Sequence, residues 1–401
     1  MTKPSPKPLA GLTVLEMGQV IAGPYCGAIL AGFGADVIKI EKPKTGDPLR
    51  TWRKMHNGTS LWWASMSRNK RSITLDLNLP QGQSIARRLA AKVDILLENF
   101  KPGTLERWGM SYETLREANS GLIMVRVSGW GQTGPYASRP GFANVAEGIG
   151  GLRYTTGYPD MPPVRTGTSI GDTLAGMHAA LGTLTAVYHR DVNGGTGQVV
   201  DVAIYESVFN MMESTLAEYD KLGVIRERNG AKIEGIVPTS TYPTLDGKFI
   251  VIGGNGDSIY RRLMRAVGRE DLAEHAEMQD NAGRVRHEPE IDQAISDWTS
   301  TKTYDEAHAA ILAAEVPVGP VYSIADIVKD EQYIAREMFD TVELAPGDTV
   351  KIPAVVPKLT ETPGGTEWPG PKLGEHNEEI YRGLLGMTAA EYEDLIAADI
   401  I

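Results

Sequence analysis

The chain has 401 residues, with 51 acidic and 40 basic side chains and a single cysteine, Cys26. The formal net charge of -11 argues against sequence-independent binding to nucleic acid or anionic lipid, because both require a basic excess. One cysteine excludes an intramolecular disulfide and a thiolate metal cluster, and the seven histidines lack metal-ligand spacing. We therefore expect no metal, no nucleic-acid partner and a reducing compartment.

The apolar segments of the sequence indicate a cytoplasmic protein that does not associate with membranes. The opening MTKPSPKPLAG lacks the apolar core of a secretory signal. No stretch approaches the roughly 20 uninterrupted apolar residues of a membrane-spanning helix. At roughly 150 residues per domain, the length predicts two to three domains.

Short apolar runs alternate with helical patterns over the first 130 residues. Strands are predicted at residues 13–17, 35–41, 72–77, 94–99 and 122–128. Helices are predicted to begin near Pro24 and to cover about 81–92 and 112–119. This alternation is typical of βαβ units, and it predicts a doubly wound α/β domain with a parallel sheet covered on both faces.

The second half of the chain begins with a long helical pattern. Apolar residues recur at steps of three and four from Leu174 to Tyr188, which predicts one apolar face of a helix that ends before Asn193. Strands are then predicted at 240–244 and 249–252, and helices at 259–267, 290–298 and 304–314. The segment 345–371 is rich in proline and is predicted to be irregular.

Two groups of residues in the first half could bind a ligand. The loop 18–23 follows the first strand, where doubly wound sheets bind ligands, but GQVIAG is not a dinucleotide fingerprint and a plain turn stays open. Arg68–Asn69–Lys70–Arg71 precedes a strand and could contact phosphates or form a solvated charge run. Further cations lie at or just after strand ends: Lys39, Lys42, Lys101 and Arg107. Together they indicate a phosphate-binding sheet edge.

Three glycine-flanked segments each have two interpretations. GTSIG at 167–171 matches the nucleophile elbow of serine hydrolases, in which Ser169 would be the nucleophile. An elbow needs a strand directly before it, and the prolines just before this segment disfavour a strand. The serine hydrolase interpretation is therefore disfavoured. Asp172 is either the N-cap of the following helix or a carboxylate nucleophile. GGNG at 253–256 either covers a ligand or forms a turn.

The chain resembles family III CoA-transferases, which include formyl-CoA and carnitine CoA-transferases and the related 2-methylacyl-CoA racemases. The matching strings are AGP at 22–24, GADVIKIE at 34–41, NKRS at 69–72, ENFKPG at 98–103, SGWGQTGP at 128–135, GD at 171–172, GQVVDV at 197–202, VPVGPV at 316–321 and LGEHN at 373–377. They cover nearly the whole chain in the family's order.

The resemblance implies a large doubly wound, Rossmann-like domain, a smaller α+β domain and ring-shaped subunits that form an interlocked homodimer. We expect the large domain at 1–200 and about 351–401 and the small domain at about 226–328. Linkers are expected at about 201–225 and 329–350. The ligands implied are an acyl-CoA and a small carboxylic acid.

The resemblance also implies an enzyme that moves CoA from an acyl-CoA, such as succinyl-CoA, to a free carboxylic acid. Asp172 falls at the family's catalytic aspartate, which forms an aspartyl anhydride and then an aspartyl-CoA thioester. Oxyanion support is implied for the loops that contain Ile21, Ala22, Gly253 and Gly254. The implied CoA-binding residues are Lys42, Leu75, Asn78, Asn99, Phe100, Thr104, Arg107 and Phe142.

Departures from the family pattern bear on the substrate. Formyl-CoA transferase has glutamine, lysine and tyrosine where this chain has Ile21, Asn78 and Phe142, so a dicarboxylate acceptor is favoured over formate or oxalate. The alternative is the racemase branch of the family. It is disfavoured because the racemase histidine aligns with Gly141, and two-base proton exchange then lacks one base.

Overall fold

The computed structural model describes residues 7–401, so the first six residues of the opening segment lie outside it. The chain divides into two compact units. The large unit contains the residues up to Leu152, Thr166–Glu213 and Gln332–Ile401. The small unit contains Arg153–Arg165 and Ser214–Glu331. Residues 201–213 and 332–350, which were expected to belong to the two linkers, fall in the large unit.

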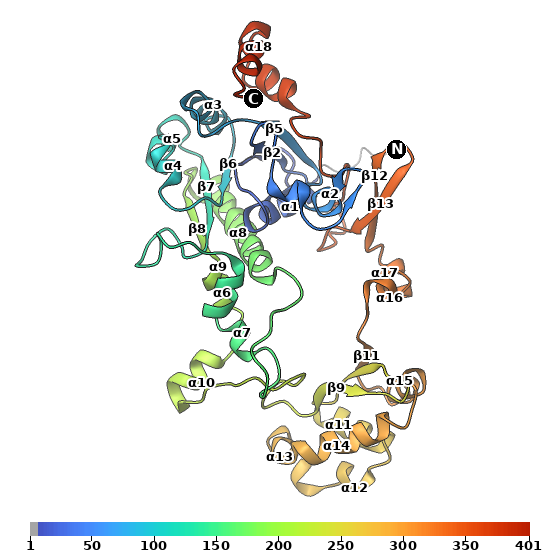
Figure 1. Ribbon diagram of the computed structural model, residues 1–401. Helices are drawn as coiled ribbons and strands as arrows, with labels where there is room; N and C mark the ends of the chain where they lie inside the picture. Colours follow the sequence, from blue (N-terminus) through green and yellow to red (C-terminus); the bar gives the residue numbers. More distant parts are fainter. Residues whose placement is uncertain (1–6) are drawn as a thin grey trace. The chain divides into compact units, whose positions relative to one another are not determined.

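A six-stranded parallel sheet forms the centre of the large unit (Figure 1). In sheet order its strands are β5 (Lys70–Thr74), β2 (Asp36–Glu41), β1 (Thr13–Glu16), β6 (Ile95–Glu98), β7 (Ile123–Ser128) and β8 (Val199–Ala203). The five strands expected from the sequence are present, although β5 begins and ends earlier than predicted. The α/β class with a parallel sheet is confirmed, and β8 is an additional edge strand.

Alternate residues of each strand point to opposite faces of the sheet, and each face has its own core. Val14 belongs to the cluster that includes Cys26 of α1 (Ala22–Gly32) and Ala179 of α8 (Ile170–Tyr188). Leu15 belongs to the cluster on the other face, which includes Leu89 of α3 (Pro80–Ala90). Further helices near the sheet are α4 (Thr104–Arg107), α5 (Tyr112–Ala118), α6 (Ala143–Ile149), α9 (Ile204–Phe209) and α18 (Ala389–Ala397).

The apolar face that the sequence predicts on α8 does not pack into the core of its own unit. Met177, Leu181 and Tyr188 are 52%, 64% and 61% exposed. The helix instead buries small residues against α1, and a Cβ on Gly176 would lie 2.8 Å from the backbone oxygen of Ala22. Small residues are favoured at this contact because they allow the two helices to approach closely.

The small unit has an antiparallel sheet in the order β11 (Val318–Pro320), β10 (Phe249–Gly253) and β9 (Thr239–Pro243). It packs with α11 (Asp257–Ala266), α14 (Glu288–Thr299) and α15 (Tyr304–Ala313) around one core. Arg284 is fully buried there, and its guanidinium donates to the carbonyl oxygens of Val237 at 3.0 Å and Asn255 at 2.8 Å. These bonds satisfy a charge that would otherwise be costly to bury.

The C-terminal segment contains a hairpin of β12 (Phe339–Ala345) and β13 (Asp348–Pro353), where an irregular segment was predicted from residue 345. Beyond it, the chain pairs with the outer edge of β5. Thr74 N donates to Asn377 Oδ1 at 2.8 Å, and Tyr381 Oη donates to the carbonyl oxygen of Thr74 at 2.6 Å. These contacts cover an otherwise open strand edge.

Within residues 7–401, no helix combines the length and apolar character that crossing a bilayer requires.

Candidate active site

Most of the predicted site residues follow parallel strands of the central sheet. Ile21 and Ala22 follow β1, and Lys42 follows β2. Leu75 and Asn78 come after β5, and the residues after β6 are Asn99, Phe100, Thr104 and Arg107. Since β5, β2, β1 and β6 are neighbours in a parallel sheet, these residues lie along one edge, where doubly wound sheets bind ligands. Phe142 comes after β7, directly before α6.

The exposure of these residues determines how each could contact a ligand. Lys42, Asn78 and Arg107 are exposed, and Phe142 is 79% exposed. The Leu75 side chain is only 1% exposed because it belongs to the core, so only its backbone could face a ligand. The edge of the sheet therefore presents cations, an amide and an aromatic ring toward solvent.

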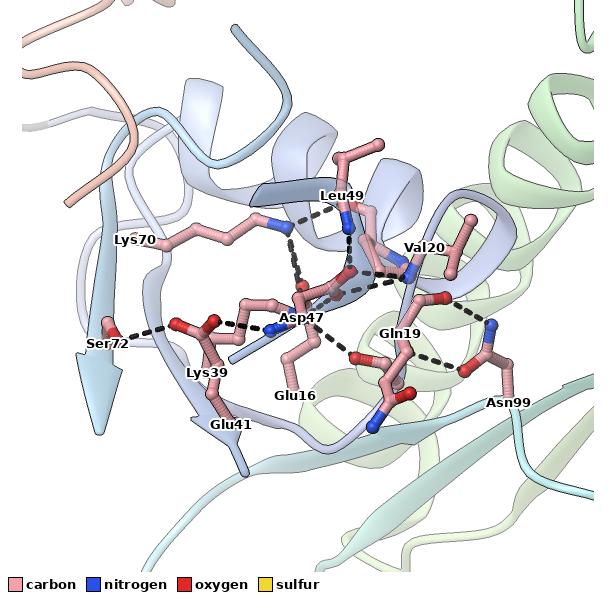
Figure 2. A network of polar contacts seen from close by, with 12 residues as sticks. Glu16, Gln19, Val20, Lys39, Glu41, Asp47, Leu49, Lys70, Ser72 and Asn99 are labelled. Carbon is pink, nitrogen blue, oxygen red and sulfur yellow. Dashed lines mark hydrogen bonds and ion pairs between the residues drawn. The ribbon is translucent and has the colours of Figure 1, made fainter. Parts of the chain in front are cut away.

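The loop between β1 and α1 is held by side chains from other parts of the sheet (Figure 2). Asn99 Oδ1 accepts from Gln19 N at 2.8 Å, and Asn99 Nδ2 donates to the carbonyl oxygen of Gln19 at 2.8 Å. Asp47 accepts from Val20 N at 3.1 Å, and Lys39 Nζ donates to the carbonyl oxygen of Gly18 at 2.8 Å. Two consecutive peptide groups of this loop, Gly18–Gln19 and Gln19–Val20, are thus fixed from outside it.

Val20 has a φ of +67°, a conformation that a β-branched residue rarely adopts. Such a backbone conformation costs about 1–3 kcal/mol, so it persists only where its surroundings impose it. The bond from Val20 N to Asp47 provides that constraint. The strained residue lies directly before Ile21 and α1. Ile21 provides no side-chain cap, so no cap hydrogen bond occupies the first N–H groups of α1.

A buried ionic network lies beneath this loop. Lys70 Nζ contacts Glu16 Oε2 at 2.8 Å and the carbonyl oxygen of Pro24 at 2.7 Å. Lys39 Nζ contacts Glu16 Oε1 and Asp47 Oδ2, each at 3.0 Å. Figure 2 shows these two lysines and two carboxylates converging on the loop. All four side chains are 1% exposed or less, and their charges balance.

Burial and pairing act in opposite directions on this network. Burial alone would raise the pKa of the Asp47 carboxyl, but Lys39 and the N–H groups of Leu49 and Val20 hold it below its usual value. Burial lowers the pKa of the Lys70 ammonium, and Glu16 offsets part of that effect. The ion pairs therefore keep charges in a region where burial alone would favour neutral groups.

The cations at 68–71, predicted to contact phosphates, have structural partners instead. Lys70 and Lys39 belong to the buried network. Arg71 pairs with Asp36 and with Glu379, the latter at 2.7 Å. Arg68 donates to Ser65 and to the C-terminal segment. The phosphate interpretation is therefore wrong for Lys39, Lys70 and Arg71. The exposed cations of the original group are Lys42, Lys101 and Arg107.

Asp172 lies in the first turn of α8 and is half-buried. The helix begins at Ile170 with Ser169 at the N-cap, so the N-cap interpretation of Asp172 is wrong. A carboxylate in a first turn is stabilised by the helix dipole. Gly176, one turn further along the same side of α8, packs on Ala22, which places this end of the helix beside the loop described above.

Two alternative sites lack structural support. Residues 158–168 contain no strand, so Ser169 is not presented by the strand-to-helix turn of a serine hydrolase. At Gly141, a Cβ would lie 2.7 Å from Trp130 Nε1 and 3.1 Å from the Gly129 Cα. The position aligned with the racemase histidine therefore has neither an imidazole nor the space for one.

The predicted site residues do not all belong to one unit. Gly253 is the last residue of β10 and Gly254 follows it, both in the small unit, whereas Asp172 and the other candidates belong to the large unit. Sequence reasoning missed Glu16 and Asp47, because nothing in their neighbourhood along the chain reveals their distant partners. It also missed Arg53 and Trp62, which line a cavity of about 490 Å³ beside the start of α8. No group of His, Cys, Asp and Glu within residues 7–401 is arranged to hold a metal ion.

The sequence is similar to those of known CoA-transferases, and the structure is similar to that of a CAIB/BAIF family protein. Residues 9–377 match CoA-transferase family III. Succinyl-CoA–D-citramalate CoA-transferase of Chloroflexus aurantiacus is 46% identical over 99% of this chain and 98% of its own length. Succinate–glutarate CoA-transferase of Agrobacterium fabrum is 35% identical over 94% of this chain and 96% of its own. A CAIB/BAIF family protein from Brucella suis is 31% identical and superposes with a TM-score of 0.82, covering 95% of this chain and all of the other. This chain therefore belongs to CoA-transferase family III and is a CoA-transferase.

Proposed function

We propose that the enzyme transfers CoA from succinyl-CoA to a free dicarboxylic acid, with Asp172 as the nucleophile. The observation that carries the proposal is the position of Asp172, in the first turn of a helix that packs through Gly176 on the loop after β1. The names of the two similar CoA-transferases include succinyl-CoA or succinate together with a second dicarboxylic acid. Both ligands would then carry a carboxylate that does not react.

The proposed reaction has four displacement steps. The Asp172 carboxylate attacks the thioester carbonyl and expels CoA thiolate, which leaves an aspartyl–succinyl anhydride. The thiolate attacks the aspartyl carbonyl, releasing succinate and forming an aspartyl-CoA thioester. The acceptor carboxylate attacks this thioester and expels CoA thiolate, and the thiolate takes the acyl group from the new anhydride, which restores Asp172. Each intermediate stays activated, so no other energy source is required.

The fixed loop would support the oxyanions of these steps. Backbone N–H groups at Ile21 and Ala22 stand at the uncapped start of α1. Donors of this kind contribute most when they are held in place before the reaction, and one such donor is worth about 3–4 kcal/mol. Asp47 and Asn99 would act as positioning residues, since they hold Val20 and Gln19 from outside the loop.

The carboxyl edge of the sheet would bind CoA. The proposed contacts are Lys42, the backbone of Leu75, Asn78, Asn99, Phe100, Thr104, Arg107 and Phe142. The cations Lys42 and Arg107 are exposed and would contact phosphates. For Gly253 and Gly254, which belong to the small unit, the proposed role is oxyanion support.

The acceptor can be identified with a panel of free acids and succinyl-CoA. We expect new thioesters with four- to six-carbon dicarboxylates, including hydroxylated ones, and much slower transfer to monocarboxylates of equal length. The products are separated by liquid chromatography and identified by mass. Hydrolysis of succinyl-CoA without any new thioester, or transfer only to monocarboxylates, would contradict the proposal.

We also propose that the enzyme is a homodimer, as the family resemblance implies. The support is the exposed apolar face of α8, since a soluble chain rarely leaves Met177, Leu181 and Tyr188 together in water. A Leu181→Asp variant should shift from dimer to monomer in light scattering coupled to size exclusion. Gln293→Asp, on a helix of the small unit, adds the same charge and should stay dimeric. A wild-type monomer at micromolar concentration would refute the proposal.

A further inference from the structure

A cavity of about 490 Å³ lies within the large unit, beside the first turn of α8. Its wall is built from α1, α2 (Leu61–Met66), the start of α8 and the segment after β13. This size falls within the range of about 300–1,000 Å³ that is typical of small-molecule sites. Ile21 is the one residue of the loop after β1 that lines the cavity, and no residue of the buried network is among the lining residues.

The lining of the cavity is apolar apart from hydroxyl groups and two guanidinium groups. Tyr25, Ile29 and Met66 contribute apolar surface, and Arg53 and Arg68 contribute the charges. No carboxylate is among the lining residues of this cavity, although acidic side chains outnumber basic ones by 51 to 40 in the chain. The cavity is therefore complementary to an anion with an apolar body.

The two arginines are presented in different ways. Arg68 is 14% exposed, and its Nε donates to Ser65 O at 3.1 Å. Its Nη1 donates to Thr366 Oγ1 at 3.2 Å and to the carbonyl oxygen of Pro353, and lies 3.9 Å from Asp340 Oδ2. Within residues 7–401, its Nη2 makes no hydrogen bond to the protein. Arg53 is exposed, and its guanidinium lies 4.6 Å from the centre of the Trp62 ring. One guanidinium is thus fixed by the fold, and the other stacks on an aromatic ring at the surface.

The cavity also borders the proposed reaction centre. Ser169, the N-cap of α8, and Thr173, which directly follows Asp172, both line it, and Ile21 lines it from the loop, whereas Asp172 itself is not among the lining residues. A ligand that enters the cavity can therefore extend from the arginines toward the residues around Asp172. The reacting end of a bound acid would lie at α8 and its other end at the guanidinium groups.

We propose that this cavity binds the non-reacting carboxylate of a dicarboxylic acid through Arg53 and Arg68, which makes these arginines the residues that select dicarboxylates. The proposal rests on the proposed function and adds to it the group that recognises the second carboxylate. The apolar wall holds the carbon chain between the two carboxylates. A monocarboxylate has no second carboxylate to pair with the arginines and would gain nothing from them.

The test compares glutarate with valerate, which has the same number of carbons and one carboxylate, as acceptors from succinyl-CoA. Because both reactions share one donor, an effect on the donor half cancels in their ratio. The Arg53→Met variant should raise the KM for glutarate about tenfold or more, since it loses a charge-assisted hydrogen bond. The KM for valerate should stay within about twofold. Lys54→Met removes a neighbouring exposed cation that does not line the cavity and should change neither.

A binding measurement makes the test independent of turnover. Glutarate alone should change the tryptophan fluorescence of the wild-type protein, because Trp62 lines the cavity beside Arg53. The change should be lost in Trp62→Phe and should need at least about tenfold more glutarate in Arg53→Met. Arg68→Lys, which retains the charge at a fixed position, should retain part of the glutarate preference.

The possible results separate this inference from the proposed function. Two results would refute the role of the cavity and leave the transferase reaction intact. In the first, Arg53→Met and Lys54→Met impair transfer to glutarate equally. In the second, Arg53→Met impairs transfer to glutarate and to valerate equally. If the wild type transfers CoA to no acid, the proposed function fails. In that case the fluorescence titration alone decides whether the cavity binds a dicarboxylate.

Discussion

An Asp172→Asn variant is expected to lose CoA transfer by about 10³-fold or more while keeping its fold. Asparagine retains the shape of the side chain in the first turn of α8, but its amide cannot form the anhydride on which the exchange depends. The loss should fall on kcat, with the KM for succinyl-CoA little changed, because CoA would be bound along the carboxyl edge of the sheet. Initial rates with a dicarboxylate acceptor measure both parameters.

A second experiment detects the covalent intermediate. Hydroxylamine added with succinyl-CoA should convert Asp172 to a hydroxamate, which peptide mass spectrometry locates, and no other carboxylate should react. Asp191→Asn, just beyond the far end of α8, removes an exposed charge and should leave the rate unchanged. Normal activity in Asp172→Ala, or trapping at a different residue, would contradict the mechanism.

The parts of the fold that were predictable are those whose signal lies within a few residues of sequence. A central parallel strand is buried on both faces, so β2 and β7 appear as short, largely apolar runs between helical patterns, each interrupted by one cation, Lys39 or Arg126. The edge strand β8, VVDVA, is just as apolar but partly exposed, and it was not predicted. The hairpin of β12 and β13 was hidden by the prolines around it, although Gly347 has the positive φ that a tight turn requires.

The candidate site shows the same limit more sharply. Asp172 and the residues after the strands could be located through motifs and strand ends, because topology places such residues at one edge. The charges of Lys39 and Lys70 were visible, but their partner Glu16 is 23 and 54 residues away in the chain. Sequence therefore showed cations without showing that they were already paired.

The face of α8 illustrates a further limit. The period of three and four correctly predicted a helix, and it correctly grouped Met177, Leu181 and Tyr188 on one side. Periodicity does not say which neighbour covers that side. Here the helix packs on α1 through its small residues, as Gly176 shows, and the larger apolar side chains are exposed within the unit.

Replacing Glu16 should cause the largest loss of stability among single changes in the network. A Glu16→Gln variant keeps the size of the side chain but leaves two buried ammonium groups with Asp47 as their nearest remaining carboxylate. Breaking a buried ion pair in this way costs about 3–5 kcal/mol. The free energy of unfolding from urea titration measures the loss. Glu379→Gln breaks the exposed pair with Arg71 and should cost about 1 kcal/mol or less.

A double variant distinguishes an unbalanced charge from a general packing defect. Lys70→Met combined with Glu16→Gln removes one charge of each sign, so Lys39 and Asp47 remain as a balanced pair, and part of the lost stability should return. Activity should not recover in parallel, because Lys70 also donates to the carbonyl oxygen of Pro24 at the start of α1. If the double variant is less stable than the sum of the single changes, the network does not act through charge balance. If its activity is fully restored, the network does not position the loop.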